Sequence, residues 1–188
     1  TASAVSVTGL AFISPVILLI KDHYSVSSNE VQLTITIYLV AICIAQVFWG
    51  PLSDLIGRRI VLIFGASLFS LGGILASLNL AFEVFIFFRF LQGIGAAACL
   101  SMPRVMLTES YGVKKAAAKM STLLAFMAIF PILSAAFGGY IGENYGWQIN
   151  FLTLFIFGVA VFSLNYVYSP ETIKNKSKRL TFRATFLD

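Results

Sequence analysis

Apolar residues in this chain form long continuous runs that are separated by short polar connections. Six runs cover residues 2–20, 31–50, 60–80, 84–104, 121–141 and 149–168. Each run has about 20 residues, the length that a helix needs to cross the hydrocarbon core of a bilayer. Strands of a membrane barrel are about half as long and alternate between apolar and polar positions, so they do not fit. The pattern predicts an all-α membrane protein with six transmembrane helices.

Local signals refine the predicted helix boundaries. Ser27 and Glu30 have the spacing of a capping box, so the second helix is expected to start near Ser28. Only residues 81–83 separate the third and fourth runs, which predicts antiparallel neighbours. Prolines within or near the runs are expected to kink or end helices, namely Pro15, Pro103 and Pro131.

Composition supports lipid as the solvent. The chain is 59% hydrophobic and 11% charged, whereas soluble domains carry about 25% charged residues. It opens at Thr1 without a methionine or a signal sequence, so we expect a cut piece. Cys43 and Cys99 lie inside apolar runs and are expected to be free thiols, the alternative being a disulfide or metal pair. We expect no metal or other cofactor and no nucleic-acid partner.

The basic residues predict the orientation in the membrane. Eleven of the 13 lysines and arginines lie in the second-to-third connection, the fourth-to-fifth connection and the tail. Positively charged residues are enriched on the cytoplasmic side of membrane proteins, so both termini are expected in the cytoplasm. The membrane is expected to be a plasma membrane or an inner membrane. Residues 169–188 are then a cytoplasmic basic linker, or a segment that lies on anionic lipid.

Small residues recur at helical spacing in three of the runs. Such rows let helix backbones approach closely where lipid provides no hydrophobic drive for association. They predict a compact bundle with packing faces at Ala66, Ser70, Gly73 and Ser77 in the third helix, Gly93 and Ala97 in the fourth, and Ser134, Gly138 and Gly142 in the fifth.

One pattern of glycines and an acid occurs twice. The two copies are offset by 89 residues and consist of Gly50, Asp54 and Gly57, and of Gly139, Glu143 and Gly146. The first copy falls on the predicted inner side and the second on the outer side. The bundle is therefore predicted to be a 3+3 inverted repeat, an organisation that secondary transporters use.

The sequence GPLSDLIGRR at residues 50–59 resembles the major facilitator superfamily signature G-x-x-x-D-x-x-G-R-R/K at its usual place between helices two and three. The resemblance covers nearly the whole chain and implies one half of a twelve-helix transporter, with a second half as partner. It implies a conformational latch in this connection, formed by Gly50, Asp54, Gly57, Arg58 and Arg59. The alternative is a charged turn that only sets the topology.

The sequence RFLQGIGA at residues 89–96 is similar to the R-x-x-Q-G-x-G-A pattern of the same family. Arg89 lies about 10 Å into its helix at 1.5 Å per residue, where a charge is costly and functional by default. The resemblance implies that Arg89, with Gln92 on the same face, handles protons or substrate; the alternative is snorkelling to the outer headgroups. Gln46 and Tyr38 are weaker candidates that either line the pathway or bond between helices.

Within the superfamily the chain is most similar to the bicyclomycin/chloramphenicol-resistance (Bcr/CflA) drug:proton antiporters. This implies secondary active efflux of drug-like or hydrophobic and cationic small molecules, coupled to protons. The alternatives are a metabolite uptake porter or a non-transporting half or remnant; no pattern of an enzyme is found. The branch carries an acid on its first helix, where this chain has Ala11, so the coupling carboxylate lies in the second half, at a surface acid such as Asp54, or is absent.

Overall fold

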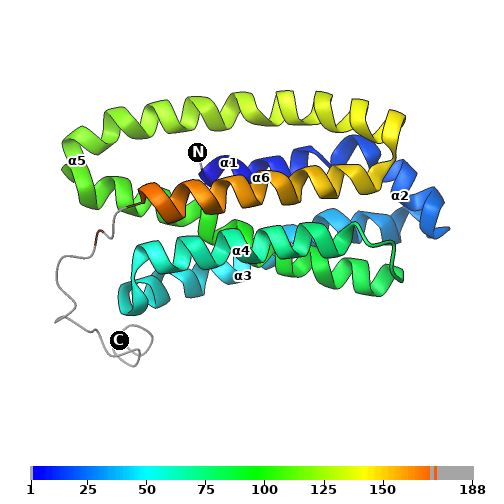
Figure 1. Cartoon of the computed structure of the whole chain (residues 1–188), viewed down its shortest axis with the longest axis horizontal. Helices are drawn as coiled ribbons and strands as arrows, with labels where there is room; N and C mark the ends of the chain where they lie inside the picture. The colour runs from blue at the N-terminus through cyan, green and yellow to red at the C-terminus, as the bar shows by residue number, and fades with distance from the viewer. Residues whose placement is uncertain (1, 170–171, 173–188) are drawn as a thin grey trace.

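The computed structural model describes residues 2–169 and residue 172, which form a bundle of helices that run side by side (Figure 1). In chain order the elements are α1 (Ala2–Ala11), the 3-10 turn η1 (Ser14–Val16), α2 (Ile17–Tyr24), α3 (Ser28–Ile56), α4 (Arg58–Ala76), α5 (Phe82–Tyr145) and α6 (Trp147–Tyr168). Six segments of this described part are long and apolar enough to cross a membrane. The predicted class of all-α membrane protein is confirmed. The expected linker 169–188 lies outside the described residues, apart from Ser169 and Thr172.

Helix α5 contains two membrane spans, Phe82–Gly112 and Lys115–Tyr145, which we call its first and second limbs. They meet at Gly112, whose φ of 69° and ψ of 161° are not helical. A residue without a Cβ adopts this positive φ at little cost. The chain therefore folds back on itself at Gly112 with hardly any loop (Figure 1). Pro103 and Pro131 lie inside the two limbs without ending them.

The first span is a broken helix, as expected from Pro15. α1 stops at Ala11, Pro15 lies in η1, and α2 continues to Tyr24. Proline has no N–H to donate, and its ring clashes with the carbonyl four residues earlier. The span therefore changes from α-helix to 3-10 turn and back again.

Two further helix boundaries, the start of α3 and the end of α4, compare differently with the sequence prediction. Ser27 caps α3 as expected: its hydroxyl accepts from the Glu30 N–H at 3.2 Å, and the Glu30 carboxylate accepts from the Ser27 N–H at 2.8 Å. α4 ends at Ala76, although its apolar run continues to Leu80. The reason is local, since Asn79 has a φ of 58°, which a helix cannot accommodate. The apolar character of the loop concealed this end.

Alternate connections lie at opposite ends of the bundle (Figure 1). The α3–α4 turn, the Gly112 break and the end of α6 share one end, and the α2–α3, α4–α5 and α5–α6 connections share the other. Gly57 and Gly146 make the two turns of the repeated pattern. Gly57 has φ 117° and ψ 144°, Gly146 has φ 90° and ψ 153°, and each N–H donates to the carbonyl four residues earlier. The repeated pattern thus forms two equivalent turns.

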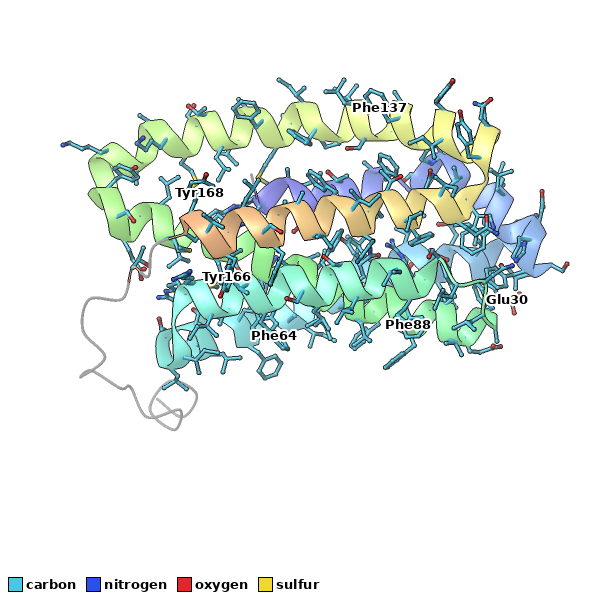
Figure 2. The ribbon with its side chains drawn as sticks, in the orientation of Figure 1. Glu30, Phe64, Phe88, Phe137, Tyr166 and Tyr168 are labelled. Atoms are coloured by element: carbon cyan, nitrogen blue, oxygen red, sulfur yellow. The ribbon has the colours of Figure 1, made fainter. Side chains whose placement is uncertain are left out.

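Small residues lie where helices touch backbone to backbone. Gly95 in the first limb of α5 faces Gly65 and Phe69 of α4, and a Cβ at position 95 would collide with their backbone atoms. Larger apolar side chains point outwards from the bundle, as Phe64 and Phe137 do in Figure 2. The interior is therefore closely packed, and the outer surface is apolar, which suits contact with lipid or with further membrane-spanning helices.

Substitution of Gly95 by alanine is expected to lower the thermal stability of the complete protein in detergent, because the new methyl group meets backbone atoms. Overpacking of this kind costs about 1–3 kcal/mol. Gly139→Ala is the matched control, since its nearest neighbour would be the Pro15 Cβ at an ordinary 3.5 Å. Thermal unfolding of the two variants gives the comparison, and equal melting temperatures would contradict the described packing.

Candidate functional site

Arg89 lies at the centre of the bundle, where α1, α3 and the first limb of α5 meet. Its side chain is completely buried, with 0% exposed. Its Nη1 donates to Gln92 Oε1 at 2.6 Å and to the Gly9 carbonyl at 3.4 Å, and its Nε donates to the Thr34 carbonyl at 3.3 Å. The ring of Tyr38 lies 4.4 Å from the guanidinium carbon. We call these five residues the Arg89 cluster.

The snorkelling alternative for Arg89 is wrong, because the side chain is completely buried and its hydrogen-bond partners lie inside the bundle. Gln92 accepts from Arg89 as the spacing of the two residues on one helix face permits. The sequence motif therefore describes one hydrogen-bonded pair rather than two separate polar positions.

The charge of Arg89 has no carboxylate partner among the described residues. Carbonyl oxygens and the faces of two rings, Tyr38 at 4.4 Å and Phe151 at 5.5 Å, take the place of an acid. Three buried polar atoms of the cluster have no hydrogen-bond partner, namely Arg89 Nη2, Gln92 Nε2 and Thr34 Oγ1. Buried groups of this kind call for an explanation, and all three atoms can donate a hydrogen bond to a further polar or anionic group.

Tyr38 and Gln46, the two candidates on the second helix, lie in different surroundings. Tyr38 is buried, and its hydroxyl donates to the Ser6 carbonyl at 2.9 Å, which links α3 to α1. Gln46 is exposed on the outside of the six-helix bundle. Eight residues at 100° each leave the two side chains 80° apart around the helix, and this rotation separates them.

Arg58 is the centre of a second polar group at the other candidate site. It forms ion pairs with Asp54 and, at 3.1 Å, with Glu109 of the first limb of α5. It also donates to Ser53 Oγ and, at 3.4 Å, to the Gly50 carbonyl. These contacts join α3, α4 and α5 at the end of the bundle where α6 also ends. We call Asp54, Arg58 and Glu109 the Arg58 cluster.

The predicted latch residues divide into three positions. Gly50 lies inside α3 rather than in the connection, and Gly57 alone makes the turn. Arg59 points away from the Arg58 cluster: its Nη2 donates to the Tyr166 carbonyl at 2.6 Å, near the end of α6 where Figure 2 labels Tyr166. A cation at the carboxyl end of a helix also complements the helix dipole.

The predicted packing residues of α5 lie where its two limbs meet other segments. Gly93 faces the backbone of Tyr38 in α3, and Ala97 is completely buried. In the second limb of α5, Ser134 donates to Thr8 Oγ1 at 3.5 Å. Gly138 and Gly142 approach the segment around η1, at Phe12 and Val16.

Two polar residues in the structure were missed by the sequence reasoning. Glu109 pairs with Arg58 across 51 residues of sequence, and its other oxygen accepts from Thr172 Oγ1 at 2.6 Å. The sequence feature that could have revealed Glu109 is its place as a single acid in an otherwise basic connection. Asn150 is completely buried within α6 and donates to two carbonyls. The sequence feature that could have revealed Asn150 is a polar amide inside an apolar run.

The described residues contain no group of three or more His, Cys, Asp or Glu side chains that could bind a metal ion. Cys43 is an exposed free thiol and Cys99 a buried one.

Comparison with known sequences decides the family. Residues 1–187 match the sequence model of the Major Facilitator Superfamily. The chain belongs to this superfamily. Its membership agrees with the GPLSDLIGRR sequence at the α3–α4 turn and with an integral membrane protein of six apolar helices.

Curated superfamily relatives are similar to most of the chain. The multidrug resistance protein MdtL of Escherichia coli O81 (strain ED1a) is 32% identical over 153 residues, which are 81% of this chain and 39% of the relative. MdtL of Shigella dysenteriae serotype 1 (strain Sd197) is 31% identical over the same share of each chain. The matched region thus spans about two fifths of the length of these superfamily members.

The Arg58–Glu109 ion pair can be measured by a double-mutant cycle on the complete protein. Arg58→Gln and Glu109→Gln are expected to show a coupling of about 1 kcal/mol, the upper end for pairs at the surface, because the Arg58 side chain is only 11% exposed. The measurement is the free energy of unfolding of both single variants and the double variant. Arg59→Gln with Glu109→Gln is the control pair and should be additive, since Arg59 bonds to Tyr166 instead. Equal coupling in both cycles would refute the assignment.

Proposed function

We propose that this chain is the N-terminal six-helix half of a secondary active transporter that exports drug-like small molecules by alternating access. Superfamily membership and the names of its relatives, multidrug resistance proteins, support efflux. The resemblance to the Bcr/CflA branch supports hydrophobic or cationic substrates and exchange for protons. The substrate site lies at the midplane, between this half and a second one.

The observation that carries this proposal is the buried charge of Arg89. A guanidinium inside a lipid-embedded bundle is costly and marks a pathway by default. In this cluster Arg89 Nη2 and Gln92 Nε2 are donors without partners. Arg89 and Gln92 then bind a polar group of substrate or coupling partner when the halves rearrange. Tyr38 positions Arg89, and Gln46 lines the path from its exposed face of α3.

A second half is the partner that best fits the second limb of α5. Only 6% of an 18-residue apolar stretch of this limb is buried within the described bundle, against 50% for the corresponding stretch of the first limb. Its apolar side chains, including Leu133 and Phe137, are exposed. The matched region covers only 39% of the MdtL relatives, which supports a partner for this limb outside these residues.

The Arg58 cluster is the proposed latch. Asp54 and Arg58 face Glu109 at the end of the bundle that we assign to the cytoplasm, with Gly50 and Gly57 shaping the α3 end and Arg59 bracing α6. Ion pairs at such a surface break and form at small cost. This is the property that a latch between two conformations needs.

Proton exchange requires a titratable group that alternates between the two sides, and among the described residues no carboxylate bonds to Arg89. Position 11, where the Bcr/CflA branch has an acid, is alanine at the end of α1. We assign the coupling carboxylate to the second half, with Asp54 as the surface alternative.

Removal of the Arg89 charge is expected to lower the rate of efflux strongly. In a drug-sensitive host that expresses the complete gene, Arg89→Met should lower the export rate by at least about tenfold, the effect of losing roughly 1.4 kcal/mol. Arg104→Met is the matched control, because Arg104 lies in the same limb and, within the described part of the chain, its side chain bonds to Met127 Sδ at 3.6 Å rather than to the Arg89 cluster. The measurements are growth inhibition and transport of the same compound into membrane vesicles, at equal protein levels.

Asp54→Asn is expected to reduce transport without lowering the amount of protein in the membrane. Wild-type export by Arg89→Met and Asp54→Asn would contradict both assigned roles. Drug-independent accumulation of a metabolite would favour the uptake porter, and no transport by the wild type would favour a non-transporting half.

The orientation can be tested by cysteine labelling. In a variant without Cys43 and Cys99, Asn29→Cys is expected to react with an impermeant maleimide on intact cells, and Ser110→Cys only after the membrane is opened. Both positions are exposed and lie at opposite ends of the bundle. The reverse labelling would place the Arg58 cluster outside the cell and refute the assigned topology.

A further inference from the structure

The break in the first span leaves several backbone carbonyls without their usual helical donors, among them those of Gly9 and Phe12. In a regular helix the Ile13 N–H would donate to Gly9 and the Val16 N–H to Phe12. Here the Ile13 N–H donates to Leu10 at 3.3 Å, and the Val16 N–H donates to Ile13 at 3.1 Å. Carbonyls freed in this way need other donors, since lipid offers none.

Two side chains from other spans donate to these two carbonyls. Arg89 Nη1 donates to the Gly9 carbonyl at 3.4 Å. Asn150 Nδ2 donates to the Phe12 carbonyl at 3.3 Å. The superfamily motif accounts for Arg89, but it contains no counterpart of Asn150.

Asn150 also connects the break to a third element. The same Nδ2 donates to the Gly138 carbonyl in the second limb of α5 at 2.9 Å. Gly138 touches the backbone of Phe12 directly, because a Cβ there would lie 3.0 Å from the Phe12 carbonyl carbon. One amide of α6 therefore bridges two backbones that are already in contact.

The surroundings of Asn150 leave little freedom for this side chain. Its residue is completely buried, and the Cβ of a residue at position 142 would lie 3.3 Å from its Nδ2. Its Oδ1 has no hydrogen-bond partner. An amide kept at this place with an unsatisfied oxygen is costly, and its two donated bonds are the compensation visible in the structure.

We infer that Asn150 is a positioning residue that fixes the break in the first span by bridging Phe12 to Gly138. Arg89 fixes the Gly9 side of the break, and Asn150 fixes the Phe12 side. Loss of the Asn150 bridge frees residues 12–16 to open locally while the rest of the bundle stays packed. The bridge also sets how readily the outer half of the first span moves during the transport cycle. This part of the inference rests on the proposed function.

Hydrogen–deuterium exchange of the complete protein in lipid nanodiscs tests this role. Asn150→Leu keeps the side-chain size and removes the donor, so amides in a peptide spanning residues 9–17 should exchange about tenfold faster, as expected for loss of one net hydrogen bond. Peptides from α3 and α4 should be unchanged. Asn165→Leu is the matched control, because Asn165 is in the same helix and its Nδ2 donates to its own helix at Val161.

The outcomes separate positioning from general stability. Unchanged exchange at residues 9–17 in Asn150→Leu, or a rise of equal size in α3 and α4, overturns the inference. If Asn150→Leu does not reach the membrane, Asn150→Ala gives the same comparison without added bulk. Because exchange is measured without substrate, failure of the transport proposal leaves this result intact; where transport is observed, Asn150→Leu should lower the maximal rate more than it changes KM.

Discussion

The guanidinium of Arg89 and the broken first span satisfy each other's polar groups. A charge in lipid needs polar partners, and a helix interrupted by Pro15 needs donors for its freed carbonyls. Arg89 reaches the Gly9 carbonyl on the interrupted span and the Thr34 carbonyl on α3. Either feature alone would be expensive in the bilayer. Together they form a polar centre around which three spans are arranged.

Small residues bring the spans close enough for this centre to exist. A Cβ at Gly9 would lie 3.0 Å from the Phe69 ring and 3.1 Å from Tyr38 Cζ. A Cβ at Gly93 would likewise meet the backbone of Tyr38. The two glycines thus leave room for the Tyr38 ring beneath the guanidinium, where it adds a cation–π contact in a site without a carboxylate.

Sequence patterns predicted the features that depend on nearby residues. The apolar runs identified the six spans, the Ser27–Glu30 spacing identified the start of α3, and Pro15 identified the break in the first span. The end of α4 was not predictable from hydrophobicity, because the loop after it is apolar as well.

The partners of the polar residues depend on the tertiary arrangement. Arg58 was visible in its motif, but its pairing with Glu109 joins residues 51 positions apart. Asn150 bonds to Phe12 over 138 positions, so no local pattern records the contact. Tyr38 and Gln46 were candidates of the same kind in the sequence, yet α3 buries Tyr38 and exposes Gln46. Periodicity indicates which residues share a helix side, and only packing decides what that side meets.

Gly57 and Gly146 have a mechanical consequence. Each is the single residue between two long helices, α3 and α4 in one case and α5 and α6 in the other. Because a single residue connects them, the two helices of each pair cannot slide past each other at that end. Each of these two pairs is therefore expected to move as one unit, whereas the first span is interrupted between α1 and α2.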